Sequence, residues 1–369
     1  MEMFLIMLRA FNFLKQKISP SYLGVDIGTT SIKVVEVMRG DKLPRLVNYG
    51  ILESQGSLAR ANTAFQTSTL KLFEEEVEGL LRALIGRMKP KTNLAIASLP
   101  IFSAFTTVLS LPDMNPADLE KAVAFQAAQY VPLPLSEVAL DWSRVGEYEN
   151  EKGQKNVQVL LVSVPHEQIK KYQDICKAAG LVLQSLEIEP VSATRILIGS
   201  DPTPTYVIDI GSRSTAITIT DKGTIKFTSQ TDFAGSSLTQ ALATSLNINP
   251  LRAEELKKER GIIGTGPNYE LSTIMVPFLD AIISEVKRTD FSYHSQFPIA
   301  PKVERAILTG AGSNLLGIQK YFQDQLGVPV VKANPFVKFE YPRELEPLVP
   351  ELNPVLTVAL GLALREISK

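Results

Sequence analysis

The sequence is poor in the residues that build disulfides and metal clusters: it has one cysteine, Cys176, and two histidines, His166 and His294. A single thiol excludes an internal disulfide and fits a reducing compartment. Nowhere does the chain contain the roughly 20 consecutive apolar residues that a membrane-spanning helix needs. A Gly-x-x-x-x-Gly-Lys-Ser/Thr loop is also absent, so any nucleotide site is not of the P-loop type.

The chain has no excess of positive charge, with 38 Lys and Arg against 39 Asp and Glu. Nucleic-acid binding therefore has no electrostatic support, and we expect no nucleic-acid partner. The length of 369 residues favours about two domains. A hydrophobic share of 45%, with mixed helix and strand patterns, allows a sizeable core and argues against wholesale disorder.

Each half of the chain contains the tripeptide Asp-Ile-Gly, followed by hydroxyl-bearing residues and flanked by two strand-like runs. The first copy is Asp26–Gly28, before Thr29 and Thr30, and the second is Asp209–Gly211, before Ser212. Two similar hairpins in the two halves of one chain indicate a duplicated unit.

These turns have the composition of a phosphate site. A carboxylate at the end of a strand can hold a hydrated metal ion, and a glycine in the turn lets backbone N–H groups approach phosphate oxygens. One such turn alone is usually a structural hairpin. The recurrence of Asp, Gly, hydroxyls and strand pattern together favours function, and two facing turns predict a site that holds a nucleotide triphosphate from both sides.

The N-terminus has apolar residues on one helical face: Phe4, Met7, Leu8, Phe11, Leu14 and Ile18. We predict an amphipathic helix over residues 1–20. A signal peptide would have its charge before the apolar stretch and a cleavage site after it, and this segment has neither. Three interpretations stay open. The helix packs on its own domain, or it rests on a membrane or a partner. In the third, the start codon is assigned too early and Met7 is the true start.

Strand and helix patterns divide the chain further. Strands are expected within 22–52, a polar loop from 54 to 69 and a helix from 70 to 88, and Asp201–Thr205 reads as a linker. The predicted parts are the N-terminal helix (1–20), a first lobe in two segments (21–92 and 186–200), an inserted module of strands and helices (93–185), and a second lobe (201–369).

With these features the chain resembles the actin-like ATPase superfamily of actin, the large heat-shock chaperones and sugar kinases. Within it, the sequence is similar to the PilM family of type IV pilus assembly proteins, and next to the FtsA family of cell division. The stretches that carry the resemblance are Leu23–Lys33, Leu111–Met114 with Ala122–Gln126 and Gln129–Pro132, Leu186–Pro190, and Gly361–Arg365. The resemblance implies an α/β, two-lobed actin-like (ribonuclease H-like) ATPase fold with an inserted SHS2 module, to which the second of these stretches corresponds.

Carried over by position, the resemblance gives the phosphate end of the site. Asp26 and Asp209 match the two carboxylates that hold the Mg²⁺ of bound ATP through water. The first phosphate turn corresponds to Gly28, Thr29 and Thr30, and the second to Gly211 and Ser212. Lys33 matches a phosphate-binding lysine; taken alone, it reads equally well as a solvated lysine on a strand.

The same comparison places the nucleoside. Glu254 and Lys257, three residues apart on one helical face, match the pair that binds the ribose hydroxyls. The adenosine-binding turn corresponds to Gly310, Gly312 and Ser313, with Ala311 where the family usually has a second glycine. Glu189 aligns with a residue that orients the attacking water, although a carboxylate at a helix N-terminus also stabilises the helix.

The resemblance implies a cytoplasmic ATP-binding assembly protein of a type IV pilus or related system, with slow or regulatory hydrolysis. Its partners would be the cytoplasmic N-terminal peptide of a PilN-like inner-membrane protein and the motor components of pilus assembly. That partner would hold the chain at the inner face of the inner membrane, as a peripheral membrane association, by docking an extended peptide between the module and the first lobe.

Two alternatives remain. A small-molecule kinase of the same fold would need a catalytic base beside a substrate pocket, and no substrate-binding signature is evident. An FtsA-like division protein usually carries a membrane-binding helix at its C-terminus, whereas this sequence ends at Glu366–Lys369.

Overall fold

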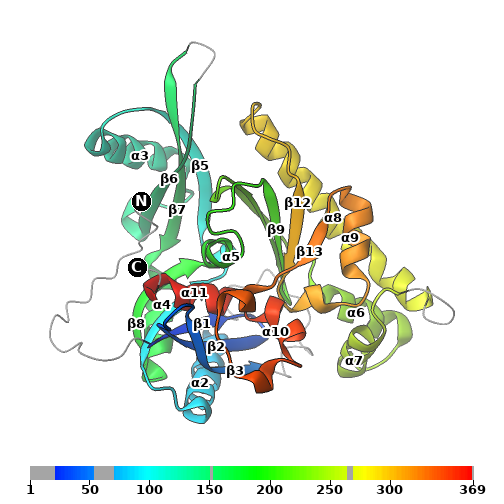
Figure 1. The fold of residues 1–369 in the computed structure, drawn as a ribbon. Coiled ribbons are helices and arrows are strands. Elements are labelled where there is room, and N and C mark those ends of the chain that lie inside the picture. Colours follow the sequence, from blue (N-terminus) through cyan, green and yellow to red (C-terminus); the bar gives the residue numbers. More distant parts are fainter. Residues whose placement is uncertain (1–20, 54–69, 150–152, 264–268, 368–369) are drawn as a thin grey trace.

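The protein, analysed as a computed structural model, contains two five-stranded sheets of the same order and a smaller third sheet (Figure 1). The structure describes residues 21–53, 70–149, 153–263 and 269–367. The predicted helix over 1–20 and the predicted loop over 54–69 lie outside these ranges. None of the helices in the described ranges is both long and apolar enough to cross a membrane.

The first sheet has the order β3-β2-β1-β4-β8. Its first three strands form antiparallel hairpins, and β4 and β8 then extend it in parallel. The strands are β1 (Ser21–Ile27), β2 (Ser31–Met38), β3 (Arg45–Glu53), β4 (Leu94–Leu99) and β8 (Val182–Ile188). Two helices cover one side of this lobe, α2 (Leu70–Met88) and α4 (His166–Ala178).

The second sheet, β11-β10-β9-β12-β13, repeats this arrangement of two antiparallel and two parallel pairings. Its strands are β9 (Thr205–Ile210), β10 (Thr215–Asp221), β11 (Thr224–Thr231), β12 (Arg305–Thr309) and β13 (Val330–Lys332). The duplication predicted from the two Asp-Ile-Gly hairpins is confirmed, because β1–β2 and β9–β10 occupy equivalent positions in the two sheets.

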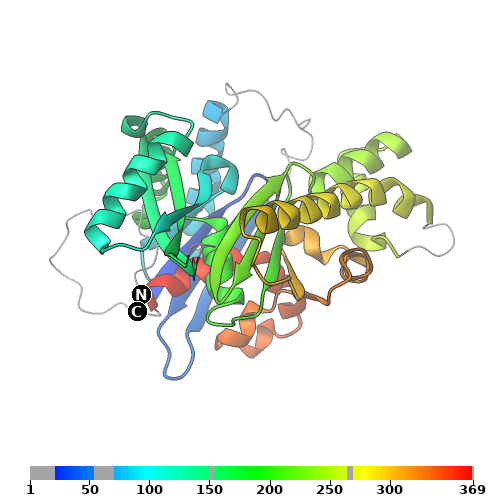
Figure 2. The ribbon, with the colours of Figure 1, turned by 90° about the horizontal axis from the view of Figure 1, so that it is seen from above.

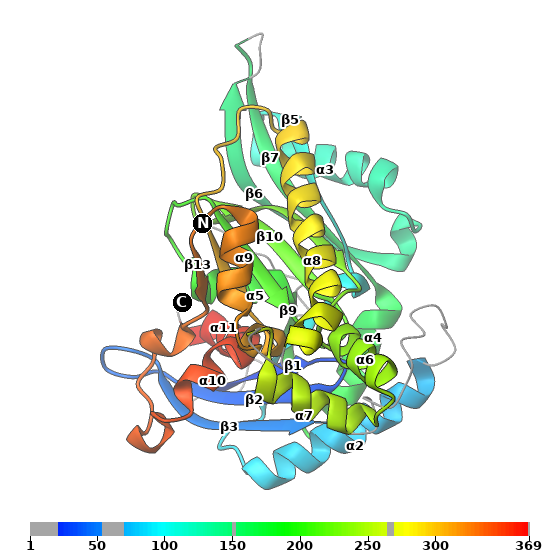
Figure 3. The same cartoon turned by 90° about the vertical axis from the view of Figure 1, so that its right-hand side faces the viewer.

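Helices of the second lobe pack around this sheet. The long α8 (Tyr269–Gln296) lies along it, beside α9 (Ile318–Leu326) (Figures 2 and 3). Two shorter helices, α6 (Gly235–Leu246) and α7 (Pro250–Arg260), pack on each other. These last two reach the space between the lobes, where the candidate site lies.

Two helices lie between the sheets, α5 (Glu189–Leu197) and α11 (Thr357–Ile367), with α10 (Val349–Val355) beside them (Figure 1). Close contact depends on glycine at both surfaces of α11. A Cβ atom on Gly24 of β1 would lie 1.9 Å from the Ala359 carbonyl oxygen, and one on Gly361 would lie 2.1 Å from that of Ser192. The C-terminal helix therefore packs directly on the first sheet.

The third sheet, β5-β7-β6, belongs to the insertion. It consists of β5 (Phe105–Pro112), β6 (Val138–Glu149) and β7 (Lys155–Pro165), and α3 (Pro116–Tyr130) covers one face with an apolar core of its own. β6 and β7 stay paired as far as Glu149 and Lys155. The insertion and α2 lie at opposite ends of the molecule (Figure 3).

These pairings differ from the boundaries expected from the sequence. Within the range 93–185, β4 and most of β8 are hydrogen bonded into the first sheet, and α4 packs on α2 of that lobe. Within the range 201–369, α11 packs on β1. We propose that the insertion comprises residues 100–165 only and that the C-terminal helix belongs to the first lobe.

Candidate functional site

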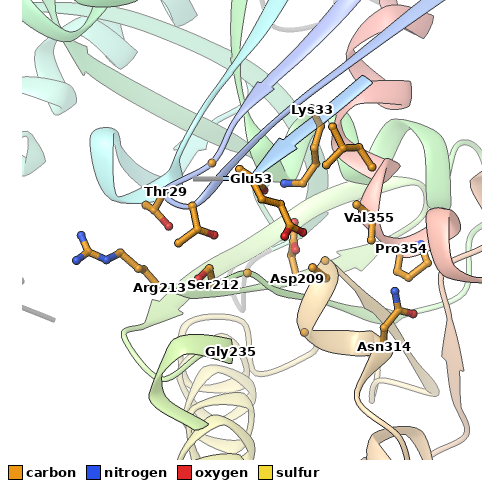
Figure 4. Close-up of a pocket in the computed structure, with 18 of the residues that line it drawn as sticks. Thr29, Lys33, Glu53, Asp209, Ser212, Arg213, Gly235, Asn314, Pro354 and Val355 are labelled. Atoms are coloured by element: carbon orange, nitrogen blue, oxygen red, sulfur yellow. The ribbon is translucent and has the colours of Figure 1, made fainter. Parts of the chain in front are cut away.

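A cavity of about 840 Å³ lies between the lobes and is lined by both Asp-Ile-Gly turns (Figure 4). Every site residue expected from the sequence lines it except Ser313: Asp26, Gly28, Thr29, Thr30, Lys33, Glu189, Asp209, Gly211, Ser212, Glu254, Lys257, Gly310 and Gly312. Residues from separate stretches of the chain thus converge on one space of a size typical of a small-molecule site.

Asp26, at the end of β1, is held at both carboxylate oxygens. Lys33 pairs with it across the hairpin, and the Lys33 Nζ lies 3.1 Å from Asp26 Oδ2. The Ser98 hydroxyl donates to Asp26 Oδ1 over 2.8 Å from the end of β4. Asp26 is 4% exposed, so this carboxylate is fixed in place at the wall of the cavity.

Three carboxylates and one ammonium group share the floor of the site. Burial alone would lower the pKa of Lys33, but the negative charges of Asp26, Asp209 and Glu189 outweigh it and raise that pKa above its ordinary value. Burial, with the charges of Asp26 and Asp209, raises the pKa of Glu189 well above the ordinary value. Asp209, desolvated and near Asp26, has its pKa raised to about 6. The site therefore favours the arrival of a further cation.

The two turns close with the same backbone hydrogen bond. The Gly28 N–H donates to the Ser31 carbonyl over 3.0 Å, and the Gly211 N–H donates to the Ser214 carbonyl over 3.0 Å. Since these two N–H groups are used inside the turns, the donors left for a ligand come from the residues that follow each glycine. The second turn is also tied to the start of α6, where Ser236 N–H donates to the Ser212 carbonyl over 2.7 Å.

Glu254 and Lys257, on α7, form an ion pair with the Lys257 Nζ 2.6 Å from Glu254 Oε2; the lysine is buried and the glutamate half-buried. The same ammonium donates to the Thr239 hydroxyl over 2.8 Å and to the Gly235 carbonyl over 3.0 Å. Burial lowers the pKa of Lys257. In this structure the pair is anchored to α6, and both side chains border the cavity.

The turn after β12 requires glycine at Gly310. Its φ angle is +79°, and a Cβ atom there would lie 2.3 Å from Asp209 Oδ1. Gly312 likewise approaches Ile210, where a Cβ atom would lie 2.4 Å from the Ile210 Cγ2. Ser313 does not line the cavity: it is fully buried, and its hydroxyl donates to the Gly310 carbonyl over 2.7 Å. The Ser313 side chain therefore stabilises the turn and does not face the cavity.

Several lining residues had no signal in the sequence. They are Phe102 at the start of the insertion and, labelled in Figure 4, Glu53 at the end of β3, Arg213 after the second turn, Asn314, and Pro354 and Val355 of α10. None belongs to a motif, and they come together only because the two lobes face each other. Arg213 and Asn314 directly follow residues of recognised motifs, Ser212 and Ser313.

Comparison with known proteins agrees with this geometry. The sequence profile of the family described as Type IV pilus assembly protein PilM matches residues 24–367. The cell division protein FtsA of Enterococcus hirae is 23% identical over 344 residues, which cover 84% of this chain and 77% of that protein.

Solved structures show the same fold. A chain of the PilM-PilN type IV pilus biogenesis complex superposes with a TM-score of 0.76 at 24% identity, covering 94% of this chain and 98% of that chain. MreB 5 of Spiroplasma citri, solved bound to AMPPNP, gives a TM-score of 0.53 at 13% identity, covering 95% of this chain and 97% of that chain. The predicted two-lobed actin-like α/β fold is thereby confirmed.

Proposed function

Because the chain belongs to the PilM family of type IV pilus assembly proteins, we propose that it is an ATP-binding clamp whose nucleotide state shapes a surface for a PilN-like partner. The single observation that carries the nucleotide part is the cavity, which brings both Asp-Ile-Gly turns and the Gly310–Gly312 turn together. A clamp of this kind needs only different affinities of its two states for ATP, so hydrolysis is slow or regulatory.

The lining residues fit ATP in order along the cavity. The turns at Thr29, Thr30 and Ser212 supply hydroxyl and backbone donors to the phosphates, and Lys33 adds a positive charge. The purine is assigned to the Gly310–Gly312 turn, whose two glycines let the turn pack closely on Asp209 and Ile210. Glu254 and Lys257 face the ribose hydroxyls, and Glu189 orients water at the terminal phosphate.

The carboxylates also fit Mg²⁺. This ion prefers oxygen ligands and commonly uses one or two carboxylates, with water and phosphate oxygens completing its coordination. Asp26 and Asp209 provide two carboxylates from the two lobes, and burial together with the charge of Asp26 raises the pKa of Asp209 to about 6. Bound Mg²⁺ would relieve this repulsion and neutralise charge on the phosphates.

The insertion offers the surface for the partner. In its sheet β5 and β6 are the outer strands, and an outer strand can accept an extended peptide through main-chain hydrogen bonds. Large apolar side chains are exposed on or beside it, as expected of a protein contact: Phe102, Phe125, Tyr130, Leu133 and Leu135. We propose that the cytoplasmic N-terminal segment of a PilN-like inner-membrane protein docks between the insertion and the first lobe.

Docking of this segment would hold the protein at the inner face of the inner membrane and connect it to the motors of pilus assembly. The similarity of this chain to a protein solved within a PilM-PilN complex supports such a partner. A segment at residues 1–18 would contribute to membrane contact in a secondary way.

Calorimetry with Mg-ATP, Mg-GTP and metal-free ATP tests the nucleotide part. We expect heat of binding only with the adenine nucleotide and a marked loss without Mg²⁺. Equal affinities for Mg-GTP and Mg-ATP would contradict the assignment of the Gly310–Gly312 turn to adenine. Absence of binding for every nucleotide would overturn the proposal of an ATP-binding clamp.

A synthetic peptide with the sequence of the partner's cytoplasmic N-terminus tests the docking. We expect binding by the wild type and weaker binding when Tyr130 and Leu133 are both changed to Ser. Phe291→Ser is the matched control, since Phe291 is 73% exposed on α8, outside the insertion. An equal loss of peptide affinity in the Tyr130 and Leu133 double variant and in Phe291→Ser would exclude the insertion as the docking surface.

Fractionation separates the partner from the N-terminal segment. Deleting residues 1–18 in one strain and the partner in another, we expect membrane association to be lost only when the partner is absent. Association that depends solely on residues 1–18 would contradict docking as the means of recruitment.

A further inference from the structure

We propose that Arg213 determines the preference of the cavity for a nucleoside triphosphate over a diphosphate. This inference deepens the nucleotide-binding proposal and rests on it. Arg213 directly follows Ser212 in the second turn and lines the cavity. A guanidinium group offers paired N–H donors that match two oxygens of one phosphate.

The cavity has an excess of negative side chains. Among the residues that the structure describes, seven carboxylates line it, against four cations. The carboxylates are Asp26, Glu53, Glu189, Asp209, Glu254, Glu255 and Glu351, and the cations are Lys33, Arg213, Lys257 and Lys258. A polyphosphate that enters such a space needs positive charge that is not already committed to a carboxylate.

The three lysines are committed. Lys33 pairs with Asp26 at 3.1 Å, and Lys257 and Lys258 both pair with Glu254, at 2.6 and 3.7 Å. Within the described ranges, the Arg213 guanidinium forms no ion pair and no side-chain hydrogen bond. Arg213 is also only partly buried. Among the described residues that line the cavity, Arg213 is therefore the cation that is free to bind an incoming anion.

The position of Arg213 suggests which phosphate it meets. Figure 4 shows Arg213 with Ser212 and Thr29 at one end of the cavity, and Asn314 and Pro354 at the other. The Arg213 side chain extends away from Asp209 in the same view. Because Ser212 is assigned to the phosphates and Arg213 directly follows it in the same turn, the guanidinium lies next to the phosphate-binding part of the cavity. The terminal phosphate is the group that distinguishes ATP from ADP.

A contact with the terminal phosphate alone changes the two affinities unequally. Hydrogen bonds to charged groups stabilise a complex enough that losing one weakens binding roughly 10-fold or more. Arg213→Ala should thus weaken Mg-AMPPNP binding by about that factor and leave Mg-ADP binding nearly unchanged. Arg213→Lys should recover part of the loss, because it keeps the charge without the paired donors.

Calorimetry with Mg-AMPPNP and Mg-ADP, on the wild type and these variants, provides the test. Arg288→Ala is the control: its guanidinium is exposed on α8, pairs with Glu285 at 2.6 Å and does not line the cavity. An equal loss for both nucleotides, or no loss for either, would overturn the role of Arg213 while nucleotide binding itself stands. If the wild type binds neither nucleotide, the proposed function fails as well.

Discussion

The ammonium group of Lys226 on β11 donates to the backbone carbonyl of Val145 on β6. Lys226 belongs to the second lobe, whereas the insertion that contains Val145 is joined by its chain to the first lobe. Two further contacts lie beside this one: the hydroxyls of Thr106 and Thr228 are 2.8 Å apart, and Thr224 donates to the Val145 carbonyl over 2.9 Å. The insertion therefore bridges the two lobes.

The environment of Lys226 gives a prediction for stability against pH. Burial lowers the pKa of this residue to about 8, from an ordinary 10.5. Between these two values the unfolded chain binds more protons than the folded one, so the contribution of Lys226 to stability improves as pH rises from about 8 to 10.5. Lys226→Met removes this gain, and its stability relative to the wild type should fall by roughly 2–3 kcal/mol over that range.

Chemical unfolding of both proteins at pH 7.5 and 10.5 measures this change. Lys222→Met is the control, because Lys222 lies exposed in the turn of the same hairpin. A relative stability of Lys226→Met that does not vary with pH would contradict the buried position of the Lys226 ammonium.

The charge of Asp209 should lower the stability of the ligand-free protein and strengthen Mg-ATP binding. Burial and the nearby charge of Asp26 raise its pKa to about 6, so the folded state favours the proton and loses stability as pH rises from about 4 through 6. Asp209→Asn should stabilise the ligand-free protein at pH 7.5 by on the order of 1 kcal/mol, after discounting for exposure to the cavity. It should also weaken Mg-ATP binding.

Thermal unfolding without nucleotide measures the stability of this variant. Asp201→Asn provides a contrast of opposite sign, because hydrogen bonds from Thr203 and Arg305 lower the pKa of Asp201 to about 2. If Asp209→Asn lowers the melting temperature as Asp201→Asn does, then Asp209 is not a destabilising charge in the ligand-free protein.

Gly24 should tolerate no side chain. A Cβ atom there would lie 1.9 Å from the Ala359 carbonyl oxygen, so Gly24→Ala forces α11 away from β1. We expect a loss of about 1–3 kcal/mol or more. Gly86→Ala on α2 is the matched control: nothing lies within 4 Å of its added methyl, and alanine in a helix should stabilise the protein slightly. Equal unfolding temperatures of the two variants would contradict the packing of α11 on β1.

Glu189 has two assigned roles that one variant separates. Glu189→Ala should leave Mg-ATP affinity nearly unchanged and lower any ATPase rate, if its carboxylate orients water. Phosphate release under single-turnover conditions measures this rate. Unchanged turnover would leave Glu189 with only its role at the first turn of α5.

The sequence predicted the parts of the candidate site that lie within one hairpin. It missed the residues that come together from distant segments of the chain. The turns at Asp26 and Asp209 were predictable, because a strand, a glycine and hydroxyls within one hairpin specify their own geometry. Glu53 and Phe102 were not, since only the approach of distant segments brings them to the cavity. Ser313 was assigned to the site by position in a motif, whereas its hydroxyl faces the Gly310 carbonyl.

Domain boundaries were the least predictable from sequence for a related reason. β4 and β8 are neighbours in the first sheet although the insertion separates them along the chain. Parallel pairing of such distant strands leaves no local pattern, unlike an antiparallel hairpin. The return of α11 to the first lobe likewise depends on Gly24 and Gly361, whose close contacts appear only in three dimensions.

Nucleotide binding by this protein depends, in our proposal, on Asp26 and Asp209 of the two lobes together holding the Mg²⁺ of one bound nucleotide. Calorimetric titration of Mg-ATP into Asp26→Ala and Asp209→Ala, with Asp324→Ala on the exposed face of α9 as control, tests this most directly. We predict affinities reduced roughly 10–100-fold in the first two variants, a loss typical of groups that orient a metal's ligands, and no change in the control. Wild-type affinity in both Asp26→Ala and Asp209→Ala would contradict the assignment of the cavity as a Mg-ATP site.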